Sequence, residues 1–147
     1  MVETFRKLFV RDLNKLKDEI KSYNNEQNIW KLDGKIANTA GNLCLHLVGN
    51  LNTYIGKELG GTGYVRNRDL EFSQKNVTQK ELVQKIEQTI EVVDKCLANI
   101  TDDILQQEYP LLVYEAKSTT GFMLGSLLAH LGYHLGQINY HRRLLDK

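Results

Sequence analysis

The chain has 147 residues, of which 41% are hydrophobic and 25% are charged, and this balance is typical of one soluble globular domain covering residues 1–147. The 19 basic and 18 acidic residues leave a net charge of +1, so the chain lacks the basic field that binds nucleic acid. Cys44 and Cys96 have no CxxC spacing, and we expect both to be buried, reduced thiols of a cytoplasmic protein.

Four helical patterns follow one another along the chain. Residues 2–23 carry apolar side chains at helical spacing, and residues 36–59 end at a glycine pair typical of a helix C-terminus. The third pattern opens with Thr78-Gln-Lys-Glu81, the spacing of a capping box, and the fourth covers residues 119–145. Four amphipathic helices with modest connections predict an all-α fold, an up-down-up-down four-helix bundle.

Three connections separate the predicted helices. Residues 26–33 form the first, which is short, and residues 62–77 form a longer loop with several charged side chains. We expect residues 101–117 to hold a short helix followed by an extended piece over residues 109–115.

Two stretches, residues 36–56 and 118–141, contain no Asp, Glu, Lys or Arg, although charged residues are frequent elsewhere. Each is long enough to raise the question of a membrane span, for which roughly 20 residues suffice. Their asparagine, glutamine and histidine side chains are too polar for lipid, so we expect no membrane partner. This polar content suits buried helices of a bundle whose interior contains a site.

The strongest functional candidates are His46 on the second predicted helix, and His130 and His134 on the fourth. Residues four apart on a helix differ by about 40° around the axis and roughly 6 Å along it, so His130 and His134 can reach one ion. In the predicted bundle the second and fourth helices run the same way, and His46 and His130 lie at nearly equal depth. The sequence predicts a three-histidine metal site, with hydrogen-bonded core histidines as the open alternative. Leu131 stands where the zinc-protease motif HExxH has Glu, which excludes that class.

Polar residues beside these histidines are candidates for hydrogen bonds to the ligands or for pocket lining: Asn42, Asn50, Tyr133 and Gln137. Hydrogen bonding between helices in a polar core is an equally open interpretation of the asparagines and the glutamine. His141 falls on the same side of its helix as His130, but two arginines follow it, and we expect it at the surface or at a pocket rim.

Three runs of the sequence together have the pattern of a known family. They are Gly41–Asn50 around His46, Arg66–Phe72, and Leu128–Gln137 around the other two histidines, and they occur in order over nearly the whole chain. The combination resembles the DinB/YfiT-like superfamily of bacterial proteins, closest to a branch without assigned activity. The resemblance implies a four-helix bundle in which three histidines bind a divalent metal, and these map onto His46, His130 and His134. Characterised relatives include bacillithiol transferases and mycothiol-dependent maleylpyruvate isomerases.

The leading functional hypothesis is a metal-dependent enzyme acting on a small-molecule substrate. Three neutral imidazoles leave a bound cation (Zn, Ni, Fe or Mn) with its full charge, which lowers the pKa of a coordinated water or thiol. A low-molecular-weight thiol of the bacillithiol type gives S-transfer, and water gives hydrolysis. The charge-free helices offer no acidic base, which slightly favours the thiol, although Glu71, Tyr133 or Tyr140 remain candidate bases.

The competing hypothesis is a non-catalytic metal-binding protein that responds to stress or senses metal. Structural zinc sites usually have four protein ligands, and only three are visible here. A fourth ligand from residues 66–72 would favour this alternative.

Four glycines of the last predicted helix share one face: Gly121, Gly125, Gly132 and Gly136. Each costs up to about 1 kcal/mol relative to Ala within a helix, so their alignment predicts close approach of another backbone. That backbone belongs either to a neighbouring helix or to a second copy of the chain. The resemblance implies self-association, and we expect a homodimer.

Overall fold

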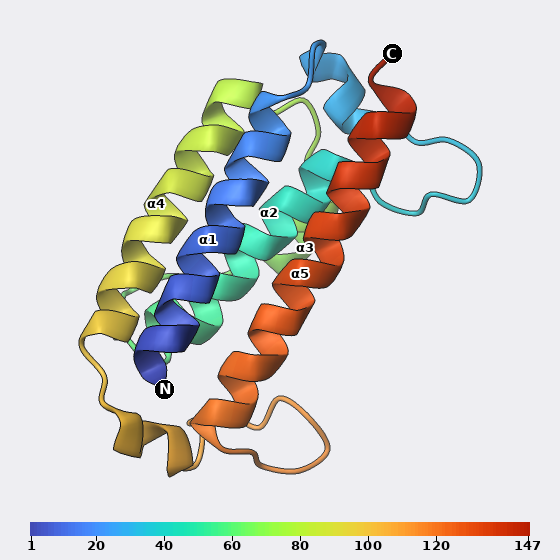
Figure 1. Cartoon of the computed structure of the whole chain (residues 1–147). Coiled ribbons are helices and arrows are strands. Elements are labelled where there is room, and N and C mark those ends of the chain that lie inside the picture. The colour runs from blue at the N-terminus through green and yellow to red at the C-terminus, as the bar shows by residue number, and fades with distance from the viewer.

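Helices account for all the regular elements of the computed structural model, which describes residues 1–147 and has no strand. In chain order the elements are α1 (Val2–Lys21), the 3₁₀ helix η1 (Glu26–Trp30), α2 (Ala40–Leu51), the π-helical turn η2 (Asn52–Lys57) that continues α2, α3 (Arg68–Ser73), α4 (Gln79–Ala98), the 3₁₀ helix η3 (Asp102–Gln106) and α5 (Thr120–Leu145). The predicted all-α class is confirmed. The long helices α1, α2, α4 and α5 lie side by side (Figure 1).

The direction of α2 relative to its neighbours differs from the predicted one. Asn52 at the start of η2 donates to the Thr89 hydroxyl of α4 at 2.9 Å, and Gly60 beyond η2 lies against Cys96 near the end of α4. Contacts that advance together along both helices mean that α2 and α4 are parallel. In Figure 1 both helices begin at the end of the molecule where α5 finishes.

Two ion pairs fix the directions of the remaining helices. Arg6 near the start of α1 pairs with Asp94 near the end of α4 at 2.7 Å, so these helices are antiparallel. Glu19 near the end of α1 pairs with Arg142 near the end of α5 at 2.7 Å, so these two are parallel. The four helices therefore run up, down, down and up, and the predicted up-down-up-down order is wrong. The connection over residues 58–78 is long enough to return the chain to the end where α2 began, which lets α4 run parallel to α2.

Side-chain caps set the helix starts. The hydroxyl of Thr39 accepts from the backbone N–H of Asn42 at 3.0 Å, and α2 therefore begins at Ala40, four residues later than predicted from Ile36. At the start of α4, Thr78 and Glu81 form the predicted capping box.

The connections differ from the prediction in two places: one contains an additional short helix, and another contains no strand. The loop over residues 62–77 contains the short helix α3, which periodicity did not reveal. The predicted short helix after residue 101 is present as η3. Residues 109–115 form no strand, and the segment is closed by an isolated bridge between Glu108 and Thr119 and by an ion pair between Lys117 and Glu108.

One hydrophobic core lies between the long helices. Each contributes a stripe of fully buried side chains, including Phe9, Leu13, Leu16, Leu47, Leu51, Ile86, Val93, Leu124 and Leu131. Cys44 and Cys96 are buried and free, as expected, and burial raises the pKa of the Cys44 thiol to about 12. None of the helices combines the length and the apolar character that a membrane span requires.

The glycine face of α5 is largely uncovered. A Cβ at Gly121 would lie 3.1 Å from the backbone oxygen of Leu105, but Gly125, Gly132 and Gly136 face open space. The predicted close approach of a neighbouring helix is therefore wrong for these three glycines, and Gly132 and Gly136 instead border an open groove between α1 and α5.

Candidate metal centre

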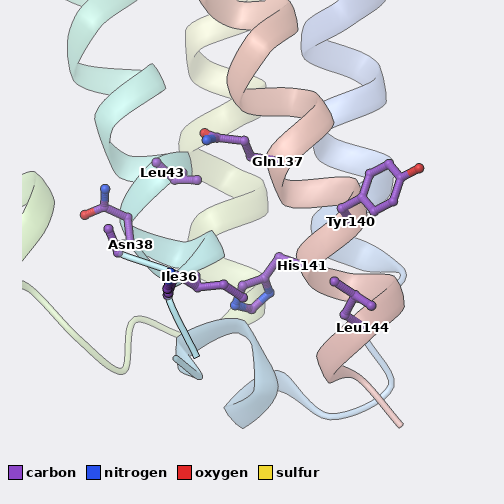
Figure 2. A pocket seen from close by; sticks show the side chains of 9 residues that line it. Ile36, Asn38, Leu43, Gln137, Tyr140, His141 and Leu144 are labelled. Atoms are coloured by element: carbon purple, nitrogen blue, oxygen red, sulfur yellow. The ribbon is translucent and has the colours of Figure 1, made fainter. Parts of the chain in front are cut away.

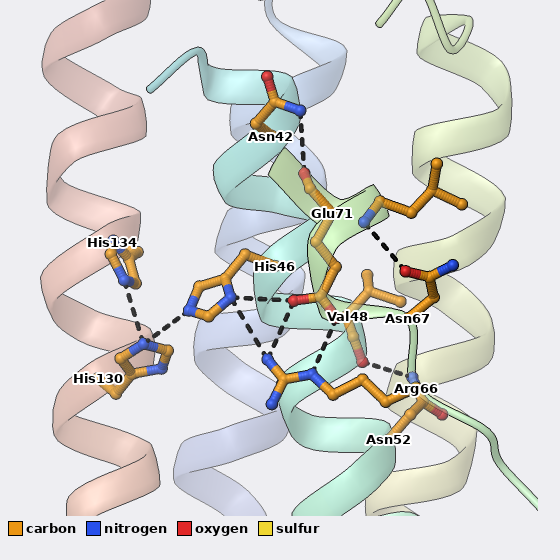
Figure 3. A network of polar contacts seen from close by, with 10 residues as sticks. Asn42, His46, Val48, Asn52, Arg66, Asn67, Glu71, His130 and His134 are labelled. Carbon is orange, nitrogen blue, oxygen red and sulfur yellow. Dashed lines mark hydrogen bonds and ion pairs between the residues drawn. The ribbon is translucent and has the colours of Figure 1, made fainter. Parts of the chain in front are cut away.

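Three imidazoles from two helices converge between α2 and α5. The Nε2 atom of His130 lies 3.1 Å from the Nε2 atom of His46 and 3.1 Å from that of His134 (Figure 3). The three ligand-type nitrogens all lie within 4.8 Å of one another. The predicted three-histidine cluster is thus present, although the helices that carry it are antiparallel. His130 lies near the middle of the long helix α5, so the shorter α2 brings His46 level with it in either direction.

The outer nitrogens of two histidines are held by oxygen acceptors. Nδ1 of His46 lies 3.0 Å from Oε1 of Glu71, and Nδ1 of His134 lies 2.7 Å from Oε1 of Gln137. An ionised carboxylate and an amide oxygen only accept hydrogen bonds, so each Nδ1 carries the proton. Nη2 of Arg66 lies 3.4 Å from Nδ1 of His46, a longer contact than the one to Glu71, and it is not a hydrogen bond in this tautomer. Each Nε2 then presents a lone pair toward His130. This is the tautomer that a metal ligand requires.

His130 cannot satisfy both neighbours with its own proton. A proton on its Nε2 can be donated to only one of the two facing lone pairs, and its buried Nδ1 has no hydrogen-bond partner. Burial, together with the charges of His134, His46 and Arg66, lowers the pKa of His130 to about 4. Burial also lowers the pKa of His134. Neutral imidazoles with three converging lone pairs fit a divalent cation, which replaces the unsatisfied contacts by three bonds.

Glu71 of α3 is the buried anion behind His46. Its carboxylate is 7% exposed and accepts from Nε of Arg66 at 2.9 Å and from Nη2 of Arg66 at 3.0 Å. Burial alone would raise the pKa of Glu71, but the hydrogen bonds from His46 and Arg66 outweigh it, so the pKa is lowered. Gly49 makes room for this group, since a Cβ there would overlap the Glu71 carboxylate. Glu71 therefore binds the outer nitrogen of His46 and is not a fourth member of the cluster.

Asn42, predicted beside the histidines, holds the helix that carries Glu71. Its Nδ2 donates to the backbone oxygens of Glu71 at 2.9 Å and Gln74 at 2.8 Å, while its Oδ1 accepts from the Thr39 hydroxyl at 2.7 Å (Figure 3). Asn42 makes no hydrogen bond to a histidine, and its effect on the cluster passes through α3.

The other predicted neighbours are divided between two places. Gln137 contacts His134 directly, as given above, and Tyr133 lies beside it with ring centroids 5.2 Å apart, but 66% of Tyr133 is exposed. Asn50 lies on the opposite side of the cluster in a pocket of about 250 Å³. That pocket is lined by His46, Asn50, Tyr54, Arg66, Arg68, Val113, Tyr114, Met123, Ser126, Leu127 and His130.

His141 was expected at the surface or at a pocket rim, and the surface position is wrong because the residue is buried. It is 4% exposed, and its Nε2 donates to the backbone oxygen of Lys31 at 2.9 Å. Its Nδ1 consequently accepts from the Tyr23 hydroxyl at 2.7 Å. His141 does line a separate pocket of about 360 Å³, together with Asn38 and Gln137 (Figure 2).

Sequence reasoning missed how Arg66 and Glu71 act. Glu71 was a candidate base or ligand, whereas the structure makes it the hydrogen-bond partner of His46, with Arg66 keeping it charged. The sequence did contain a signal for this contact. Several charged residues lie together in residues 66–71, shortly after the charge-free helix that carries the buried His46.

Comparison with known proteins adds one match. A family model described as a protein of unknown function (DUF1572) matches residues 1–147. The match includes the three clustered histidines and Glu71. Among curated proteins no match is found.

Proposed function

The chain belongs to the DUF1572 family, and we propose that it is a metal-dependent enzyme with a three-histidine centre of the DinB/YfiT-like kind. The convergence of His46, His130 and His134 supports the proposal most directly, because one proton at most is available among three ring nitrogens that face one another. The resemblance of the surrounding runs to the DinB/YfiT-like superfamily supports it independently. The proposed metal is a divalent ion that accepts imidazole ligands, such as Zn, Ni, Fe or Mn.

The chain's own groups prepare the three donors. Glu71 and Gln137 fix the ring orientations of His46 and His134 and keep their inner nitrogens unprotonated. Arg66 holds Glu71 in its ionised form. A divalent cation bound by these histidines supplies Lewis acidity, which lowers the pKa of a coordinated water or thiol.

Open coordination favours an enzyme over a structural metal site. No Cys, Asp, Glu or fourth His joins the cluster, whereas structural zinc usually has four protein ligands. A pocket of about 250 Å³ borders two of the three histidines and gives a small molecule room to bind. The alternative of a non-catalytic stress or sensor protein has no comparable support.

We favour a low-molecular-weight thiol as co-substrate and S-transfer as the reaction. Water starts from a much higher pKa than a thiol, so hydrolysis depends more on a base beside the coordinated water, and the pocket wall contains no carboxylate. The nearby carboxylate of Glu71 is fully engaged with His46 and Arg66. A thiol loses its proton when it binds a cation and needs no such base. A pocket without a carboxylate therefore favours a thiol over water as the nucleophile. A reducing compartment such as the cytoplasm, the predicted location, keeps a small thiol available.

Metal analysis followed by ligand titration tests this function. Protein reconstituted with cobalt(II) should hold one ion per chain and change its visible spectrum when 2-mercaptoethanol is added, because a thiolate ligand alters the cobalt bands. His46→Ala should neither hold the ion nor respond. Protein that binds none of Zn, Ni, Fe, Mn or Co contradicts the metal centre. A cobalt spectrum that is indifferent to thiols contradicts the S-transfer reaction.

A further inference from the structure

The pocket beside the histidine cluster is lined by an arginine whose positive charge no acidic side chain neutralises. Two arginines line it, and no acidic residue does. Arg66 is paired with Glu71, as described above. Arg68, at the start of α3, makes no ion pair and is exposed on the pocket wall.

Aromatic packing holds Arg68 near the centre. Its guanidinium carbon lies 5.3 Å from the ring centroid of Phe72, and the Phe72 ring lies 4.9 Å from the His46 ring. A guanidinium stacked on an aromatic ring keeps its N–H donors free at the edge of the plane. Arg68 can therefore donate to an anion in the pocket without leaving this position.

Asn50 supplies a second unmatched polar group on the same wall. Its side chain is 7% exposed, and its Oδ1 is buried without a hydrogen-bond partner. A buried acceptor without a donor costs free energy, which a ligand carrying an O–H or N–H would recover. Asn50 lines the pocket together with His46, His130 and Arg68.

We propose that this pocket binds the carboxylate-bearing part of a small thiol, with Arg68 donating to the carboxylate. Asn50 accepts from a hydroxyl or amide N–H of the same molecule. The thiol sulfur then points to the three histidines, so the pocket selects for negative charge on the co-substrate. This inference rests on the proposed function, because it takes the thiol to bind at the histidine cluster.

Two thiols of similar size test the role of Arg68. With cobalt(II)-loaded protein, 3-mercaptopropionate carries a carboxylate where 2-mercaptoethanol carries a hydroxyl. Arg68→Gln should weaken 3-mercaptopropionate roughly tenfold, since a hydrogen bond to a charged group is lost, and leave 2-mercaptoethanol unchanged. Arg68→Lys should keep part of the preference.

Arg143 provides a matched control on α5. Its guanidinium carbon lies 5.4 Å from the Tyr140 ring, so it is also an arginine stacked on an aromatic ring, but it lies outside the pocket. Arg143→Gln removes the same charge and should affect neither thiol. Equal losses in both variants, or no loss in Arg68→Gln, would overturn the inference. If 2-mercaptoethanol itself does not bind the metal-loaded parent, the proposed function fails as well, and this result is distinct from failure of the carboxylate preference alone.

Asn50→Leu tests the second contact. If Oδ1 serves a ligand, the substitution removes an unpaired buried acceptor, and the melting temperature without ligand should stay the same or rise. N-acetylcysteine, which adds an amide N–H to a carboxylate thiol, should bind Asn50→Leu more weakly than it binds the parent. A sharply lower melting temperature, or unchanged N-acetylcysteine affinity, would contradict this role of Asn50.

Discussion

His130 and His141 lie about three turns apart on α5, and burial lowers the pKa of both imidazoles. They differ in their partners. Both ring nitrogens of His141 have one protein partner each, the Tyr23 hydroxyl and the Lys31 carbonyl. Nε2 of His130 faces two other imidazoles, and its Nδ1 faces none. Residue type and burial do not separate the structural histidine from the proposed metal ligand, whereas the hydrogen-bond partners of each nitrogen do.

The largest effect that this comparison predicts is on metal content. His130→Ala removes the nitrogen that lies 3.1 Å from both of the others, and two remaining imidazoles make a poor site. We expect metal affinity to fall by on the order of 100-fold or more, measured by competition with a chelator. His141→Ala should retain the ion. Full occupancy in His130→Ala, or loss of metal in His141→Ala, would reverse the assignment of the two histidines.

Glu71→Gln should have the next largest effect. The amide keeps the shape of the side chain but not the charge that orients His46 and pairs with Arg66. We expect metal affinity to drop by about 10- to 100-fold, as is typical for partners behind metal ligands. Asp69→Asn is the matched control, because Asp69 is an exposed acid on the same short helix. Similar losses in the two variants would mean that net charge, and not the contact with His46, is responsible.

His141→Phe should lower stability without affecting the metal. The substitution leaves the Tyr23 hydroxyl and the Lys31 carbonyl without their buried partner. Each loss of this kind costs about 1–3 kcal/mol, so with two losses we expect the free energy of unfolding in urea to fall by about 2–6 kcal/mol. A variant as stable as the parent would show that the two hydrogen bonds contribute nothing net.

The advantage of the parent over His141→Phe should also depend on pH. Burial lowers the pKa of His141 below its ordinary 6.5, so below that pH the unfolded chain binds a proton that the folded one resists. The stability contributed by His141 is therefore present above pH 6.5 and is lost as the pH falls toward the lowered pKa. Urea unfolding of both proteins at pH 7.5 and pH 5.5 should show a smaller difference at pH 5.5. A larger difference at pH 5.5 would contradict the neutral state of His141.

The sequence predicted the three histidines but not the path of the chain that brings them together. Helical spacing placed His130 and His134 on one face, equal depth in the bundle placed His46 beside them, and the family resemblance supported all three. The relative direction of α2 and α5 depends on whether residues 58–78 turn back at once or cross the molecule, and composition does not encode that choice. The short helix α3 is too brief for periodicity to reveal, so the contact of Glu71 with His46 could not be derived.

The surface position considered for His141 is wrong for a local geometric reason. Neighbouring residues on a helix point about 100° apart, so the arginines that follow it say little about its own burial. Arg142 reaches across to Glu19, and Arg143 lies on Tyr140, while His141 points into the core.

The glycine face of α5 contrasts with the inner face that carries the histidines. A substitution on this glycine face should have the smallest effect on stability. Gly125, Gly132 and Gly136 face open space, and Phe122 and Tyr133 are exposed along the same charge-free helix. We propose that a second copy covers this face. Gly132→Leu should leave the fold intact, and it should raise monomer stability by up to about 1 kcal/mol because Leu favours helix more than Gly does.

The same substitution should abolish dimerisation, because a leucine side chain would separate two backbones that glycine lets approach. Light scattering over a range of concentrations measures this, and thermal melts report on the fold. Gly63→Leu, at an exposed glycine in the loop before α3 that also has open space at its Cβ position, is a matched control that should leave both unchanged. A parent that stays monomeric at every concentration, or a Gly132→Leu variant that dimerises as well as the parent, would contradict the homodimer. If the parent is monomeric and Gly132→Leu melts at a much lower temperature, another part of the same chain covers this face. That result would contradict the open space found at the three glycines.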